Sequence, residues 1–163
     1  MPMQTHPENM QGVELYLSLG SNQGDRRLNI EHAVSMLNIE LKKPYKAISS
    51  LIETEPWGFE SEDKFLNAVV LYELDLPKGY NAEAEGLMIL EICKDIERKL
   101  GRTGEAQYDE KGERIYTSRP IDIDILLLGD ARIDCPELTV PHRHMYERDF
   151  VMIPLSEIND KLK

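Results

Sequence analysis

The sequence predicts an α+β domain in which helices pack on one face of a mostly antiparallel sheet. Four short segments are rich in the β-branched, aromatic and other apolar residues that strands prefer. Two longer segments repeat apolar residues with the period of a helix. These segments follow one another in the order β-α-β-β-α-β, and 163 residues are enough for one domain with a sizeable core.

The first half of the chain supplies two strands and one helix. Residues 13–20 are rich in Val, Leu and Tyr and predict the first strand. Residues 21–24 form a turn, and Asp25 is suited to cap the helix that follows. Residues 47–52 predict the second strand. The apolar face of the helix consists of Ile30, Ala33, Val34 and Leu37.

The second half repeats the pattern. Residues 53–64 are a polar loop, and residues 65–74 predict the third strand. A long second helix ends at Gly101, which suits the position just after a helix, and residues 121–128 predict the fourth strand. This order is the ferredoxin-like arrangement, which leaves one face of the sheet for a ligand, with residues 130–163 around it. The apolar face of the second helix consists of Ile89, Ile92, Cys93, Ile96 and Leu100.

Composition limits the cellular setting and the partners. Residues 1–12 are polar and predict a disordered tail, which leaves residues 13–163 as a single domain. The chain has only two cysteines, and the apolar runs are too short for a membrane span, so we expect a cytoplasmic protein without a membrane partner. The net charge of −11 argues against a nucleic-acid partner. We expect a monomer.

Two aspartates carry the strongest chemical signal. Asp122 and Asp124 are two residues apart in a strongly β-prone run, so both carboxylates project from one face, about 6.6 Å apart along the strand. Neighbouring carboxylates resist burial unless a cation joins them. Mg²⁺ binds through one or two carboxylates together with substrate phosphates. The pair therefore predicts a magnesium site for phosphoryl chemistry, against the alternative of a solvated strand face.

Basic residues near this pair suggest that the ligand is a polyphosphate. Arg102 and Arg119 flank residues 103–118, a glycine-containing loop that we expect to close over the site. His142 follows a proline, where a ring nitrogen could bond a phosphate with help from Arg148. The Gly20-to-Gly24 segment lacks the lysine of a P-loop, and we expect it to be a strand-to-helix turn.

A second group of residues suits a flat heterocycle. Phe65 and Asn67 are two residues apart on a strand and share a face. An aromatic ring and an amide together can hold a planar, hydrogen-bonding ligand, and Trp57 and Phe150 extend the group. The alternative is that Phe65 and Phe150 belong to the core.

These motifs, at their spacing, resemble the 6-hydroxymethyl-7,8-dihydropterin pyrophosphokinase family of folate biosynthesis. The resemblance runs from about Leu15 to Ile158, nearly the whole chain. The matching motifs are Leu19-Gly20-Ser21-Asn22, Thr54-Glu55-Pro56-Trp57-Gly58, Phe65-Leu66-Asn67-Ala68, Ile96-Glu97 with Gly101-Arg102, Arg119-Pro120-Ile121-Asp122-Ile123-Asp124, Leu138-Thr139-Val140-Pro141-His142 and Arg148-Asp149-Phe150.

The resemblance implies transfer of a pyrophosphoryl group from ATP to the hydroxymethyl oxygen of the pterin, with release of AMP. It implies that Asp122 and Asp124 hold two Mg²⁺ ions and that Arg102 and Arg119 stabilise the transferring group. The residues implied to contact ATP are Lys94, Glu97, Tyr116, Thr139, His142 and Arg148. Those implied to contact the pterin are Thr54, Glu55, Trp57, Phe65, Asn67 and Phe150.

Two other classes of function stay open at this stage. One is another magnesium-dependent nucleotidyl- or phosphotransferase, because ferredoxin-like sheets with paired aspartates also occur in polymerase and cyclase palms. The other is a non-catalytic binding module, such as an RNA-binding sheet, which the acidic charge disfavours. AMP as the product would single out the pyrophosphokinase.

Overall fold

The protein is described by a computed structural model that covers residues 8–54, 64–101, 107–108, 110–111, 114–115 and 120–159. It is an α+β fold, as the sequence predicts. Its elements, in chain order, are β1 (Met10–Ser21), α1 (Arg26–Glu40), β2 (Ala47–Ile48), β3 (Ile52–Thr54), β4 (Phe65–Pro77), α2 (Ala82–Lys99), β5 (Gln107–Tyr108), β6 (Arg114–Ile115), β7 (Asp122–Leu128), β8 (Ile133–Cys135), β9 (Leu138–Val140), the 3₁₀ turn η1 (Met145–Glu147) and α3 (Asp149–Ile158).

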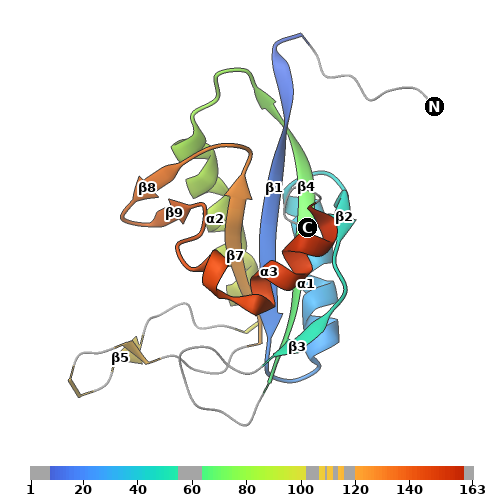
Figure 1. Cartoon of the computed structure of the whole chain (residues 1–163), viewed down its shortest axis with the longest axis vertical. Coiled ribbons are helices and arrows are strands. Elements are labelled where there is room, and N and C mark those ends of the chain that lie inside the picture. Colours follow the sequence, from blue (N-terminus) through green and yellow to red (C-terminus); the bar gives the residue numbers. More distant parts are fainter. Residues whose placement is uncertain are drawn as a thin grey trace.

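One antiparallel sheet organises the molecule. Its strands lie in the order β2-β4-β1-β7, and β3 also pairs with β4. The long strands β1 and β4 form the centre, and β7 lies at one edge, so the aspartate-bearing strand is paired on one side only. Figure 1 shows α1 and α2 behind this sheet and α3 in front of it. The two small hairpins, β5–β6 and β8–β9, form separate sheets.

The helices α1 and α2 cover one face of the sheet and bury the main core. Asp25 caps α1 by accepting a hydrogen bond from the Leu28 N–H, as predicted. Gly101 has φ +110° directly after α2, a conformation that favours glycine, which explains why the helix stops there. The core residues from β1, α1, α2, β7 and the residue just before β7 include Leu15, Leu17, Leu19, Ile30, Leu37, Ile89, Ile96, Ile121, Ile123 and Ile125.

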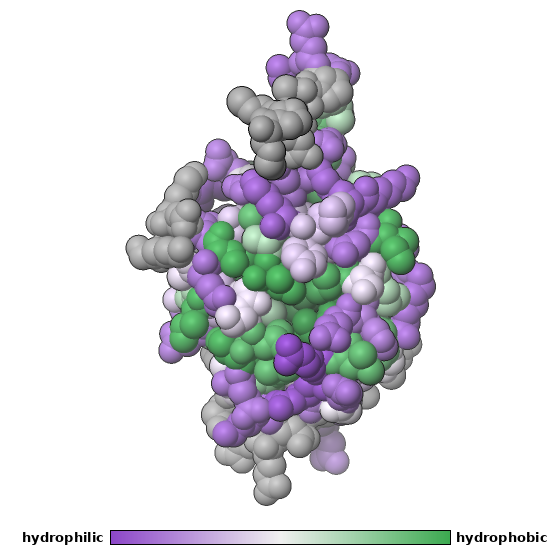
Figure 2. Space-filling model, turned by 90° about the vertical axis from the view of Figure 1, so that its right-hand side faces the viewer, coloured by the Kyte–Doolittle hydropathy of each residue, from purple (hydrophilic) through white to green (hydrophobic). Residues whose placement is uncertain are grey.

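The opposite face, which we expected to be left for a ligand with residues 130–163 around it, is available only in part. The helix α3 lies across it and buries a second apolar cluster, because its sequence is apolar on more than one side. Around this helix, apolar side chains gather on the side of the molecule where β2 edges the sheet (Figure 2). The second cluster consists of Tyr16, Val69, Leu71, Leu126, Met145, Val151 and Leu155.

The predicted second strand is interrupted, which is a further correction. Ile48 pairs with Val70 and Ile52 pairs with Asn67, so three residues lie opposite two on β4 and form a bulge. The cause is Ser49, whose hydroxyl accepts the Val69 N–H at 2.9 Å in place of a ladder carbonyl. The strand therefore divides into β2 and β3.

The strand β1 begins at Met10 rather than at residue 13, because β4 extends to Pro77 and pairs with it there. The sequence interpretation had placed these first strand residues in the tail. In the part of the chain that the structure describes, none of the helices combines the length and apolar character needed to cross a bilayer.

Candidate active site

The strand β7 places the two aspartates on the face of the sheet opposite α1 and α2. Ile121, Ile123 and Ile125 alternate with them and are buried in the main core, as predicted. The pairing with β1 sets Asp122 beside Gly20 and Asp124 beside Ser18. Both aspartates are partly buried, so their carboxylates lie at a protected surface and not in the core.

A bulge in β7 helps to complete the site. Leu17 pairs with Ile125 and Tyr16 with Leu127, so Leu126 has no opposite residue on β1. The carbonyl of Leu126 accepts a hydrogen bond from the His142 N–H at 3.0 Å. This bond fixes the segment after β9 to the strand that carries the aspartates. It thereby brings His142 close to Asp122 and Asp124.

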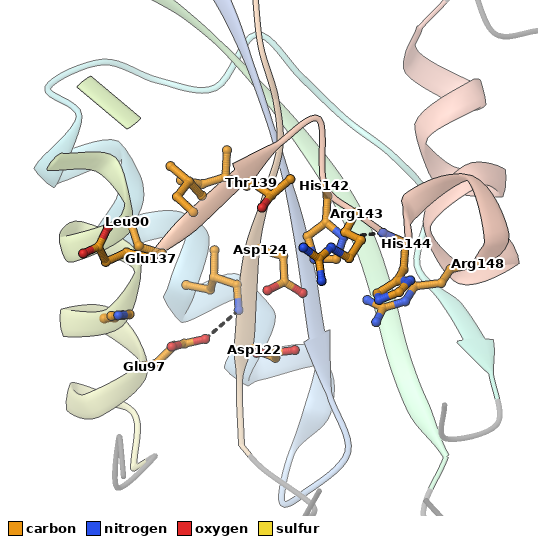
Figure 3. Close-up of a pocket in the computed structure, with 14 residues that line it drawn as sticks. Leu90, Glu97, Asp122, Asp124, Glu137, Thr139, His142, Arg143, His144 and Arg148 are labelled. Atoms are coloured by element: carbon orange, nitrogen blue, oxygen red, sulfur yellow. Dashed lines mark hydrogen bonds between the residues drawn. The ribbon is translucent and has the colours of Figure 1, made fainter. Parts of the chain in front are cut away.

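These elements enclose a pocket of about 450 Å³, a size that suits a small ligand. In Figure 3, Asp122 and Asp124 extend from β7 toward His142, Arg143 and Arg148, whereas Glu97 approaches β7 from α2 on the other side. The pocket is lined by Leu90, Lys94, Glu97, Asp122, Ile123, Asp124, Ile125, Glu137, Leu138, Thr139, His142, Arg143, His144 and Arg148.

The helix α2 contributes one face to the pocket, through Leu90, Lys94 and Glu97 at i, i+4 and i+7. Glu97 is 7% exposed, and its Oε2 accepts a hydrogen bond from the Ile123 N–H at 2.8 Å. Among the described strands, none pairs with β7 on this side, so the Ile123 N–H bonds to a side chain instead of a strand. Glu97 thus fixes the backbone between the two aspartates (Figure 3).

His142 is held as a neutral ring. Burial lowers its pKa to about 4, with Arg148 and His144 acting in the same direction and Asp122 opposing them. Its Nδ1 accepts a hydrogen bond from the His144 N–H at 3.3 Å. The proton of the neutral ring therefore sits on Nε2, so His142 presents an N–H donor to a ligand rather than a base.

The charges that line the pocket do not form an anion site by themselves. The lining includes three cationic side chains, Lys94, Arg143 and Arg148, and four carboxylates, which gives a net charge of −1 with the histidines neutral. A polyphosphate would need further positive charge to bind here. The oxygen donors of Asp122 and Asp124 suit Mg²⁺, which needs few protein ligands when phosphates supply the rest. Among the described residues, no group of three or more potential ligands forms a protein-only metal cage.

A second group of predicted residues lies on or beside the same face of the sheet, around β4, which β1 separates from β7. Asn67 is 3% exposed, and its Nδ2 donates to Thr54 Oγ1 at 2.7 Å. Phe65 is on the same strand two residues earlier and is also buried. Phe150, at the start of α3, lies beneath the Arg148 guanidinium, whose Cζ is 5.4 Å from the ring centroid. Because Arg148 also lines the pocket around Asp122 and Asp124, this contact joins Phe150 to that pocket.

The structure brings seven of the predicted site residues into one pocket: Lys94, Glu97, Asp122, Asp124, Thr139, His142 and Arg148. Sequence reasoning missed Leu90, Glu137, Arg143 and His144 as lining residues. Leu90 could have been found, because its spacing from Lys94 and Glu97 places all three residues on one face of the helix. The predictions for Glu55, Trp57, Arg102, Tyr116 and Arg119 lie outside the described residues.

Comparison with known proteins gives a consistent result. The family model for 7,8-dihydro-6-hydroxymethylpterin-pyrophosphokinase matches residues 16–160. The 2-amino-4-hydroxy-6-hydroxymethyldihydropteridine pyrophosphokinase of Porphyromonas gingivalis is 43% identical over 145 residues, which cover 88% of this chain and 89% of that protein. The enzyme of the same name from Bacillus subtilis is 37% identical over 143 residues, covering 88% of this chain and 76% of that protein.

A plant relative has a different organisation. The folate synthesis bifunctional protein of Arabidopsis thaliana is 32% identical over 156 residues, which cover 91% of this chain but 29% of that protein. The match of the family model over most of the length, together with these identities, establishes that the chain belongs to the 7,8-dihydro-6-hydroxymethylpterin-pyrophosphokinase family.

Proposed function

We propose that this chain transfers the pyrophosphoryl group of ATP to the hydroxymethyl oxygen of 6-hydroxymethyl-7,8-dihydropterin, with release of AMP, in folate biosynthesis. The observation that carries the proposal is one row across the sheet. Asn67, Gly20 and Asp122 are paired neighbours on β4, β1 and β7. An amide suited to a heterocycle and a carboxylate suited to Mg²⁺ are therefore on one face, one strand apart.

Two Mg²⁺ ions are part of the proposal, held by Asp122 and Asp124. When bound, the ions would neutralise the phosphate oxygens and bring the polyphosphate close to the acceptor hydroxyl. The chain's own part is to keep the two carboxylates in register, which β7 does through its pairing with β1 and its hydrogen bond to Glu97.

The described cations give the polyphosphate its orientation in this proposal. Lys94 comes from α2, whereas Arg148 comes from the segment before α3, so they approach the pocket from different elements. His142 adds a neutral N–H donor, and Thr139 lies beside it on the lining. We assign Arg102, Arg119 and Tyr116 to the same ligand. Such a reaction needs positioning and charge neutralisation, and no protein nucleophile.

The pterin is assigned to the neighbouring group. The bond from Asn67 to Thr54 fixes the amide for in-plane hydrogen bonds, and Phe65 supplies an apolar ring beside it. We assign Phe150 to the other face of the pterin, and Glu55 and Trp57 to its edge. We further propose a ferredoxin-like class for the sheet. The helix α1 connects β1 to β2, and the antiparallel strand β4 lies between them; α2 connects β4 to β7, and β1 lies between them.

The experiment supplies the purified protein with ATP, Mg²⁺ and 6-hydroxymethyl-7,8-dihydropterin and separates the nucleotide products by chromatography. AMP formation that depends on both the pterin and Mg²⁺ is expected. Asp122→Asn and Asp124→Asn should abolish it, whereas Asp130→Asn, an exposed aspartate just after β7, should leave it unchanged. Release of inorganic pyrophosphate would instead indicate a nucleotidyltransferase, and absence of any nucleotide turnover would leave a binding module.

A further inference from the structure

Gly86 lies inside α2, where a glycine weakens the helix. It is buried and is not among the described glycines with positive φ, so the backbone itself does not require a glycine here. A Cβ on Gly86 would lie 2.8 Å from Ile133 Cδ1 and 2.8 Å from Leu138 Cδ2. Both distances are shorter than ordinary side-chain contacts. The place of the missing side chain is therefore filled by two others, and we call this place the Gly86 notch.

The two side chains that fill the notch belong to the β8–β9 hairpin, one from each strand. Paired residues on a hairpin share a face, and so do residues two apart on one strand. By the register of this hairpin, the face that fills the notch carries Ile133, Cys135, Leu138 and Val140. The same four residues pack in or against the main core, and Figure 1 shows the hairpin beside α2. The hairpin is thus seated on the helix at Gly86.

The seat is next to the candidate pocket. Gly86, Leu90 and Lys94 follow one another on one side of α2, at i, i+4 and i+8, and the last two line the pocket. Leu138 fills the notch and also lines the pocket, and Thr139, the next residue of β9, lines it too. The depth at which the hairpin sits in the notch therefore sets the position of one pocket wall.

We propose that Gly86 is a positioning residue: its notch seats the β8–β9 hairpin on α2 and thereby fixes the pocket wall formed by Leu138 and Thr139. That the ligand of this pocket is ATP rests on the proposed function, whereas the seat does not. A methyl group at Gly86 would push the ends of Ile133 and Leu138 outward together. Because the interior around them is close-packed, the hairpin would move with them.

Cys135 offers a readout of the seat. It is half-buried on the hairpin face that meets α2, and its Sγ donates to the Leu138 carbonyl at 3.5 Å. The only other cysteine of the chain, Cys93, is 1% exposed in the core. An aromatic disulfide reagent should therefore label Cys135 selectively in the folded protein. The labelling rate should rise when the hairpin moves away from the helix, because the thiol then becomes accessible.

The test compares Gly86→Ala with Val34→Ala, which removes apolar contacts from the same core on α1. Calorimetry measures the Kd of a non-hydrolysable ATP analogue with Mg²⁺, and AMP formation measures KM for each substrate. For Gly86→Ala, the analogue Kd and the KM for ATP should rise about tenfold, because a displaced wall misplaces the ligand, and Cys135 should react about fivefold faster. The KM for the dihydropterin should stay within about twofold. Val34→Ala should lower stability and leave these quantities near the wild type.

Ile133→Val provides the rescue, since it deletes the Cδ1 atom that the new methyl group would meet. The double variant Gly86→Ala, Ile133→Val should regain part of the lost analogue affinity and label more slowly than Gly86→Ala. Ile133→Val alone should bind the analogue like the wild type. Three results would each overturn the proposal: an unchanged Kd in folded Gly86→Ala, equal effects in Val34→Ala, or no rescue by Ile133→Val.

A measurement on the wild-type protein covers the case in which Gly86→Ala does not fold. Nuclear Overhauser contacts are expected from the Gly86 α-protons to the Cδ1 methyl of Ile133 and the Cδ2 methyl of Leu138, both in the free protein and with the analogue and Mg²⁺ bound. Their absence in either state would overturn the proposal. A wild type that binds the analogue but forms no AMP would overturn the proposed function alone, and the analogue Kd would still decide on the seat. A wild type that does not bind the analogue would overturn both.

Discussion

Removal of the Glu97 carboxylate should destabilise the fold and the proposed Mg²⁺ site together. The carboxylate is buried and accepts the Ile123 N–H at 2.8 Å, at an edge of the sheet where no strand can replace it. In Glu97→Ala, this backbone N–H would lose its partner in a buried place. Because Ile123 lies between Asp122 and Asp124, any relaxation of its backbone changes the spacing of the two carboxylates.

The size of the effect follows from the burial of that N–H. An unpaired buried donor costs about 1–3 kcal/mol, and a domain of this length loses roughly 2–4 °C of melting temperature per kcal/mol. We therefore expect Glu97→Ala to melt about 2–12 °C below the wild type. Glu97→Gln retains an acceptor oxygen, so its melting temperature should lie between those of Glu97→Ala and the wild type. Urea unfolding at pH 7 in EDTA measures stability without a contribution from bound metal.

Glu91→Ala is the matched control, since Glu91 is an exposed carboxylate on the same helix. Its stability should differ from the wild type by about 0.5 kcal/mol or less. The concentration of Mg²⁺ that gives half-maximal turnover should rise in Glu97→Ala more than in Glu97→Gln. If Glu97→Ala unfolds at the same urea concentration as Glu91→Ala, the hydrogen bond does not support β7. A loss of ATP affinity that is equal for Gln and Ala would indicate a direct charge contact with the nucleotide instead.

Three further predictions concern single side chains. The pKa of His142 is about 4 in the folded protein and near 6.5 in the unfolded chain. Between pH 4 and 6.5 the unfolded chain therefore binds a proton at this residue that the folded protein does not. The free energy of unfolding should fall as pH drops from about 6.5 to 4, and His142→Gln should flatten this slope in urea titrations without metal; an unchanged slope would exclude a buried neutral ring. Tyr72→Phe removes a hydroxyl that donates to Asn38 Oδ1 at 2.6 Å and should cost about 1 kcal/mol with kcat unchanged, as chemical denaturation and the AMP assay can show. Asn67→Ala should weaken dihydropterin binding by about 1–3 kcal/mol and leave ATP binding intact, and equal losses for both ligands in calorimetry would place Asn67 in the core only.

The layers of the fold could be predicted because local patterns decide them. The alternation of Ile121, Ile123 and Ile125 with the aspartates fixed which face of β7 is buried. The capping role of Asp25 and the positive φ of Gly101 likewise follow from local chemistry. The division of the second strand could not be predicted in this way, because it depends on a hydrogen bond from Val69, on another strand, to the Ser49 hydroxyl.

The candidate site shows the same limit. The type and spacing of Asp122 and Asp124 predict a magnesium site, and resemblance to a family adds the residues expected to contact ATP. These roles stay predictions, although seven of the residues line one pocket. What neither supplied was the role of Glu97 as an anchor of β7, because its bond to the Ile123 N–H depends on which strand lies beside α2. A sequence gives no register between distant strands.

The arrangement of α3 has a consequence for the growing chain on the ribosome. The second apolar cluster draws Tyr16, Val69 and Leu126 from the main sheet, but Val151 and Leu155 come from α3, which follows every strand of that sheet in the chain. Until α3 has emerged, the sheet carries an uncovered apolar face, and an exposed face of this kind invites aggregation. The same late segment brings His142 and Arg148 to the pocket. The nascent domain therefore gains the cover of this apolar face and the complete lining of the candidate pocket in one docking step, after all strands of the main sheet have been made.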